Sequence, residues 1–323
     1  MTTAAERRLS RRQLLSRSLR LAVALPAGAI LAACGRGEDD DEAPVATAAG
    51  TSTSVRRPTP TATPLPPIIA AGVERRLLPA GGDYETPLYV FGSGRPGAVL
   101  MVLGGVHGDE PGGWQAAEAL VAAAPRPASG GLIVVPRANR LATESFVRTT
   151  EALGDLNRLY PGDPRGLPMA RMAFAIVETM RELGVTTLVD MHESWAFYRD
   201  RPQSGTAFLG QTVSSSTEPG ISLGRDVVAA VNGRIQAAHE ELFFRERQSR
   251  SPTPPASGPV NAGDDDGGAT RSGRSRSSLG LPTHLPGVVA LLVEMGQQQG
   301  LERRVALHLD VVAEVGRRIG TLA

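Results

Sequence analysis

From residue 87 onward the chain alternates short apolar runs with stretches of helical periodicity, and this alternation limits the fold more than any other feature. The apolar runs predict strands at 87–91, 98–106, 131–136, 186–192 and 288–296. The periodic stretches predict helices at 113–124, 168–183, 223–241 and 301–319. Strands separated by helices form a sheet that is covered on both faces. The sequence therefore predicts an α/β fold.

The N-terminal part follows a different pattern. Residues 1–34 combine a basic stretch, an apolar run shorter than a membrane span and small residues before Cys34, which predicts a targeting segment. Residues 10–15 (SRRQLL) resemble a twin-arginine export signal, and residues 31–34 (LAAC) resemble a bacterial lipobox. Residues 35–67 are first acidic and then rich in Thr, Ala and Pro, which predicts a disordered tether.

These signals predict an exported protein on the outer face of the cytoplasmic membrane or in the cell envelope, with a lipid on Cys34 as its contact with the membrane. The alternative is an amphipathic basic helix with an incidental cysteine. Cys34 is the only cysteine, so its lipidation leaves neither a disulfide nor a cysteine nucleophile.

Composition argues against a nucleic-acid partner. The formal net charge of +1 comes from 34 basic and 33 acidic residues, and aromatic residues are only 4% of the chain. We expect one folded domain over 68–323. Within it, residues 245–280 have almost nothing to bury and predict a flexible insertion.

Two histidines and a glutamate follow predicted strands. His107 and Glu110 lie in GGVHGDEPGG, and His192 follows TTLVDM. A His-x-x-Glu pair alone is more often a surface turn, but parallel strands bring their carboxyl ends to one edge of a sheet. Two histidines and one glutamate form a hydrolytic zinc set that leaves a position open for water.

Glu294 interrupts the apolar run VVALLVEMG, where an unpaired carboxylate is costly. This position suits a general base, and the alternatives are a sheet edge or a pair with an arginine. Asp190, two residues before His192, is a candidate to orient that imidazole, or it faces solvent.

The segment GDLNRLYPG, residues 154–162, offers Asn157 and Arg158 as adjacent donors for a substrate carboxylate. Arg148 precedes this segment in a loop-like stretch. It is a candidate to stabilise an oxyanion, although a surface arginine is the commoner case.

The motifs HGDE, an arginine with DLNR, DMHES and VEMGQQQG occur in the order and approximate spacing of the M14 zinc carboxypeptidase superfamily. Over residues 87–310 the chain most closely resembles the succinylglutamate desuccinylase/aspartoacylase branch. The resemblance implies a mixed, mostly parallel twisted sheet flanked by helices on both faces. It also implies one zinc ion held by three residues, which are His107, Glu110 and His192.

The same resemblance implies that Glu294 is the general base, that Arg148 stabilises the oxyanion, and that Asn157 and Arg158 bind the substrate carboxylate. The implied activity is hydrolysis of amide bonds in N-acyl amino acids or similar carboxylate-bearing small molecules. After Glu294 the chain reads MGQQQ where that branch usually has a valine, glycine, proline and glutamine. Two alternatives stay open: a metallocarboxypeptidase acting on peptides or cell-wall stem peptides, and a lipoprotein that only binds ligands.

Overall fold

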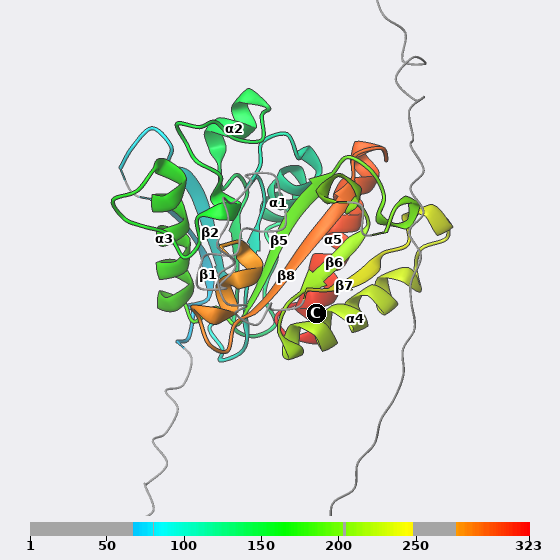
Figure 1. Ribbon diagram of the computed structural model, residues 1–323. Helices are drawn as coiled ribbons and strands as arrows, with labels where there is room; N and C mark the ends of the chain where they lie inside the picture. Colours follow the sequence, from blue (N-terminus) through cyan, green and yellow to red (C-terminus); the bar gives the residue numbers. More distant parts are fainter. Residues whose placement is uncertain (1–66, 80, 203–204, 248–275) are drawn as a thin grey trace, which may run out of the picture. The chain divides into compact units, whose positions relative to one another are not determined.

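The computed structural model describes residues 67–79, 81–202, 205–247 and 276–323 (Figure 1). The predicted signal segment with Cys34, residues 35–66 of the predicted tether and residues 248–275 of the predicted insertion lie outside the described residues. Within the described part of the chain, no helix is both long enough and apolar enough to cross a membrane.

An eight-stranded sheet organises the described residues, with strand order β1-β2-β4-β3-β5-β8-β6-β7. The strands are β1 (Gly72–Leu78), β2 (Thr86–Gly92), β3 (Val99–Leu103), β4 (Gly131–Val135), β5 (Thr187–Ser194), β6 (Thr212–Ser215), β7 (Phe243–Glu246) and β8 (Val289–Gly296). The pairs β3–β4, β3–β5, β5–β8 and β6–β7 are parallel, and the other three are antiparallel. The predicted mixed, mostly parallel sheet is confirmed.

Helices cover both faces of this sheet (Figure 1). One face packs against α1 (Pro111–Ala122), α4 (Glu218–Asn232) and α5 (Leu301–Arg318). The other packs against α3 (Pro168–Glu182) and the 3-10 helix η5 (Ser278–Thr283).

Each central strand contributes to both cores. In β3, Met101 faces the α3 core, while Leu100 and Val102 face the core formed with α1, α4 and α5. Because both faces are buried, the strand is apolar throughout, as its continuous apolar sequence predicts.

Three strands were not predicted. β1 (GVERRLL) is an edge strand with mostly exposed side chains, and β6 (TVSS) and β7 (FFRE) are only four residues long. Short or polar strands do not produce an apolar run that sequence alone reveals. The ends of the predicted insertion are also folded, because Arg245 and Glu246 belong to β7 and Ser278–Gly280 to η5.

The helix predicted at 223–241 is displaced. α4 starts at Glu218, with a proline in its first turn, and ends at Asn232. The side chain of Asn232 then accepts a hydrogen bond from the backbone N–H of Leu242 and donates to its carbonyl. These bonds close the connection from α4 to β7, and beyond residue 232 the predicted range contains only the short 3-10 helix η4 (Ala238–Glu240).

We expect Leu100→Ala to lower the free energy of unfolding by about 2–5 kcal/mol, because the side chain is fully buried between the sheet and the helices. The control is Val73→Ala on β1, where the side chain is 62% exposed and the expected change is below about 0.5 kcal/mol. Denaturant unfolding measures both. Equal losses for the two variants would contradict the packing described for β3.

Candidate metal centre

The carboxyl ends of β3 and β5 lie side by side, since Leu103 pairs with Asp190. After β3 the chain turns at Gly105, whose φ of 63° lies in the left-handed region that favours glycine. This turn leads to His107 and to Glu110, which is the N-cap residue of α1. His192 lies near the end of β5, so two segments distant in sequence meet at one edge of the sheet.

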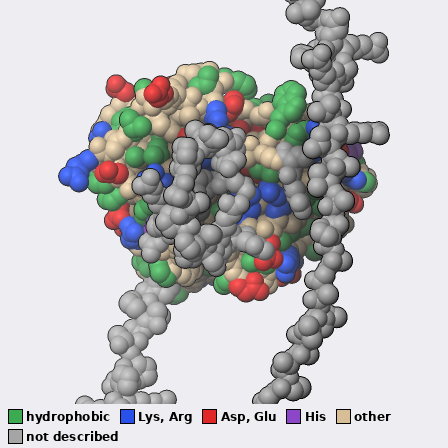
Figure 2. All heavy atoms as spheres, in the orientation of Figure 1, with side chains coloured by type: hydrophobic (Ala, Val, Ile, Leu, Met, Phe, Trp, Pro, Cys, Tyr) green, Lys and Arg blue, Asp and Glu red, His purple; other side chains and the backbone are tan. Residues whose placement is uncertain are grey.

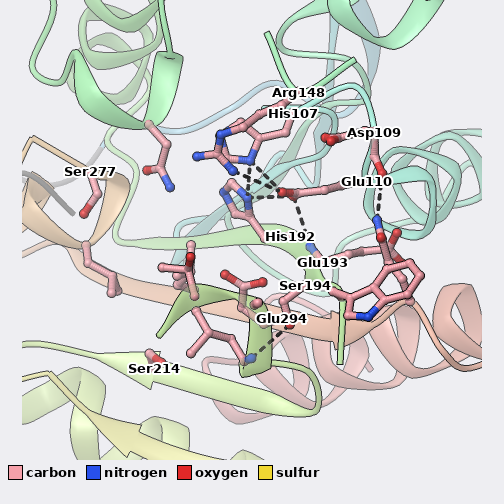
Figure 3. Close-up of a pocket in the computed structure, with 18 of the residues that line it drawn as sticks. His107, Asp109, Glu110, Arg148, His192, Glu193, Ser194, Ser214, Ser277 and Glu294 are labelled. Atoms are coloured by element: carbon pink, nitrogen blue, oxygen red, sulfur yellow. Dashed lines mark hydrogen bonds and ion pairs between the residues drawn. The ribbon is translucent and has the colours of Figure 1, made fainter. Parts of the chain in front are cut away.

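His107, Glu110 and His192 converge on one point (Figure 3). The Nδ1 atoms of His107 and His192 are 3.1 Å apart. They lie 2.7 Å and 2.8 Å from the two carboxylate oxygens of Glu110. All three side chains are buried, and one donor atom from each lies within 4.8 Å of the others. The structure therefore brings the predicted ligand set together with its donor atoms facing a common centre.

On each imidazole, the Nε2 atom that points away from the common centre lies beside a carboxylate. Nε2 of His107 lies 3.2 Å from Oδ1 of Asp155, and Nε2 of His192 lies 3.0 Å from Oδ2 of Asp190. An imidazole that donates from Nε2 keeps the Nδ1 lone pair for a metal, and metal-ligating histidines usually have such a partner. Asp190 occupies the position that the sequence suggested for it.

Asp155 was missed as a partner of His107. It lies in the DLNR motif, two residues before Asn157, but 48 residues separate it from His107. Only the folded chain shows that the two meet. Its carboxylate also accepts a hydrogen bond from Nη2 of Arg148 at 3.0 Å.

The charges at this centre favour a cation. Burial by itself lowers the pKa of both histidines, but Glu110 and Asp155 beside His107, and Asp190 and Glu110 beside His192, raise both above the ordinary value. Burial raises the pKa of Glu110, yet the two imidazoles hold it far below its usual range. A divalent metal can take the place of the protons that this site retains. The residues therefore fit a metal ion.

Glu294 lies directly across from His192 in the parallel pairing of β5 and β8. It is buried and lines the same cavity as the three candidate ligands (Figure 3). Burial raises the pKa of Glu294 to about 7. It forms no ion pair with any described residue, so the structure does not support the alternatives of an exposed edge or an arginine partner. A carboxylate with such a pKa suits proton transfer near neutral pH.

The cavity over these groups has a volume of about 470 Å3. Asn157 and Arg158, which the sequence resemblance predicts to bind a substrate carboxylate, both line this cavity. The side-chain oxygen of Asn157 accepts a 3.0 Å hydrogen bond from the backbone N–H of Ser278, which orients the amide so that its NH2 group is the remaining donor. Nη1 of Arg148 is 3.9 Å from Glu110, and its side chain is 46% exposed.

Further arginines line the cavity. Arg245 and Arg247 come from β7 and its end, within the range predicted to be a flexible insertion, and therefore sequence reasoning missed them. The space-filling view shows basic side chains over the middle of this face (Figure 2). They are all arginines, because the chain contains no lysine. The cavity also contains carboxylates, from Asp109, Glu110, Glu193 and Glu294, so its lining combines both signs of charge.

Comparison with protein families identifies this part of the chain. Residues 96–196 match the model of the succinylglutamate desuccinylase/aspartoacylase catalytic domain. The matched range includes all three candidate metal ligands, whereas Glu294 lies beyond it. The predicted succinylglutamate desuccinylase/aspartoacylase resemblance is confirmed over this range. A search of curated proteins finds no match to the sequence.

Solved structures of this catalytic-domain family share the fold. A succinylglutamate desuccinylase from a Silicibacter species has 20% identity and a TM-score of 0.53, with 80% of this chain and 70% of that chain covered. An aspartoacylase family protein from Mesorhizobium loti has 19% identity and a TM-score of 0.53, with 78% and 68% covered.

The cell shape determinant protein Csd4 from Helicobacter pylori, in a product-bound form, has 17% identity and a TM-score of 0.54. The match covers 70% of this chain and 51% of Csd4, so the chain spans about half the length of that protein. At these identities the likeness shows the fold.

We expect Asp155→Asn to weaken metal binding by roughly 10–100-fold, because the carboxylate beside Nε2 of His107 both orients the ring and makes it more basic. Titration of the metal against a chelator of known affinity measures the change. Asp163→Asn is the control, since Asp163 is outside the cavity and its side chain accepts a hydrogen bond from the backbone N–H of Arg165. Equal affinity in the two variants would remove Asp155 from the metal centre.

Proposed function

We propose that this protein is a zinc-dependent hydrolase of amide bonds that deacylates N-acyl amino acids or similar carboxylate-bearing small molecules. The main support for this proposal is that the buried donor cluster of His107, Glu110 and His192 lies in the same cavity as Glu294. Two histidines and a glutamate are the ligands of hydrolytic zinc enzymes, in which one coordination position stays open.

When bound at these three residues, zinc supplies Lewis-acid polarisation of the scissile carbonyl. Glu294 accepts a proton from the attacking water as the water oxygen bonds to the carbonyl carbon. It then passes that proton to the amide nitrogen as the carbon–nitrogen bond breaks. The raised pKa of Glu294 suits both transfers, since the group has to accept and release a proton at similar pH.

The arginine and amide groups bind the substrate. Arg148, close to Glu110, stabilises the negative charge that develops on the carbonyl oxygen. Asn157 and Arg158 bind the free carboxylate beside the scissile bond through N–H donors. When the carboxylate is bound there, the amide lies at the metal centre. Binding of the carboxylate therefore orients the scissile bond for reaction.

A metallocarboxypeptidase that acts on peptides, including cell-wall stem peptides, is the second candidate. The observation in its favour is the shared fold with Csd4, which is described as a D,L-carboxypeptidase. Incubation of the purified chain with N-acyl amino acids and with peptides separates the two candidates. Hydrolysis of the N-acyl amino acids supports the deacylase, and release of C-terminal residues from peptides alone contradicts it.

We also propose that the protein is exported and anchored to the membrane by a lipid on Cys34. The support is the order of the three N-terminal signals, which are the SRRQLL motif, the apolar run and the LAAC motif. Mass spectrometry of the membrane fraction tests this. Loss of residues 1–33 together with a lipid on Cys34 is expected, and an intact N-terminus would contradict the proposal.

Glu294→Gln should leave metal content unchanged and lower kcat at least 100-fold, because an amide cannot accept the proton of the attacking water. Turnover and bound metal are measured on the same sample. Glu302→Gln in α5, outside the cavity, is the control. Unchanged turnover in Glu294→Gln would refute its assignment as the base. Tight ligand binding without turnover by the wild-type chain would favour a ligand-binding lipoprotein instead.

A further inference from the structure

A buried ion pair lies beneath the metal centre, on the other face of β5. His192 lies on the same face of the strand as Leu188, in the α3 core, so Glu193 points the opposite way, toward α1 and α5. There its Oε2 lies 2.6 Å from Nη1 of Arg304 in α5. Glu193 is 4% exposed and Arg304 is 7% exposed. Within the described residues, Glu193 is the one acidic partner of Arg304.

Stability does not explain this pair. Taking two charges out of water is costly, and apolar residues of similar volume often replace a buried ion pair without loss of stability. The pair is also incompletely hydrogen-bonded, because Nε of Arg304 has no hydrogen-bond partner among the described residues. A buried pair of this kind can instead serve to hold the elements around it in one specific conformation.

Glu193 of this pair is connected to the candidate metal ligand Glu110 in two ways. The backbone N–H of Glu193 donates to Oε2 of Glu110 at 3.0 Å, which holds the carboxylate that faces both imidazoles (Figure 3). The side chain of Glu193 packs against Gly112 in the first turn of α1, and a β-carbon at position 112 would overlap Oε1. Since Glu110 is the N-cap residue of α1, the position of this turn sets the direction of the ligand.

We propose that Arg304 is a positioning residue for the metal centre: by pairing with Glu193, it keeps the end of β5 and the first turn of α1 in the arrangement that aims Glu110 at His107 and His192. This inference rests on the proposed function, because it assumes that a metal occupies the centre. Arg304 itself lies outside the cavity and contacts no candidate ligand.

The test compares Arg304→Met with Arg303→Met in the full chain. Arg303 is the neighbouring residue of α5, and its guanidinium pairs with Glu240 at 2.7 Å near the surface. Zinc affinity is measured by competition with a chelator, well below the unfolding temperature. Arg304→Met should bind zinc roughly 10–100-fold more weakly than wild type, as expected for loss of a group that supports a ligand. Arg303→Met should bind zinc as wild type does.

A double variant, Glu193→Gln with Arg304→Met, separates positioning from a structural role. It contains no unpaired buried charge, so its unfolding temperature should rise above that of Arg304→Met. Its zinc affinity should stay low, because nothing ties the Glu193 side chain to α5. Wild-type affinity in Arg304→Met, or recovery of affinity together with stability in the double variant, would overturn the inference. A wild-type chain that binds no zinc would overturn the proposed function itself.

Discussion

The carboxylate of Glu110 lies between two imidazoles, and the rest of the centre is arranged around this contact. Glu110 and His192 are 82 residues apart, so local sequence cannot bring them together. Parallel pairing of β3 with β5 does so, because both strands end at the same edge of the sheet. The two apolar cores keep these strands in register, and a shift of one residue in β5 would turn His192 toward the opposite core.

The two faces of β5 have different tasks. On one face, His192 lies 3.0 Å from Asp190 and opposite Glu294 of the neighbouring strand, so the candidate ligand and the proposed base are adjacent. On the other face, Glu193 and Arg304 connect β5 to two helices. Alternation of side chains along a strand thus lets one tetrapeptide, DMHE, supply both the metal-facing groups and their support.

Sequence predicted the parts of this protein that depend on apolar runs and compact motifs. The five apolar strands, the candidate ligands and Glu294 follow from such patterns, because His107 and Glu110 come soon after β3 and because His192 and Glu294 lie within β5 and β8. The contact between Asp155 and His107 could not be predicted, since it depends on how a loop returns to the centre. Arg245 could not be predicted as a residue of the cavity, because β7 has only four residues and precedes a segment with few apolar side chains.

The sequence contains even less indication of the ion pair between Glu193 and Arg304 than of the positions of Asp155 and Arg245. Glu193 adjoins His192 but belongs to no motif that the sequence singles out, and an arginine in an amphipathic helix normally faces solvent. Burial of such a group appears only when the helix is packed against the sheet. Supporting residues of this kind escape motif searches, because their spacing from the ligands depends on the whole fold.

The donor cluster of His107, Glu110 and His192 is proposed to hold a single zinc ion. Zinc-edge X-ray absorption spectroscopy of the zinc-loaded chain tests it most directly, since the spectrum reports the donor atoms themselves. Zinc held by these three residues should give scattering from two imidazole rings, with all remaining donors being oxygen at distances of about 2.0–2.2 Å. A sulfur shell near 2.3 Å from Cys34, or a single imidazole, would contradict the assignment.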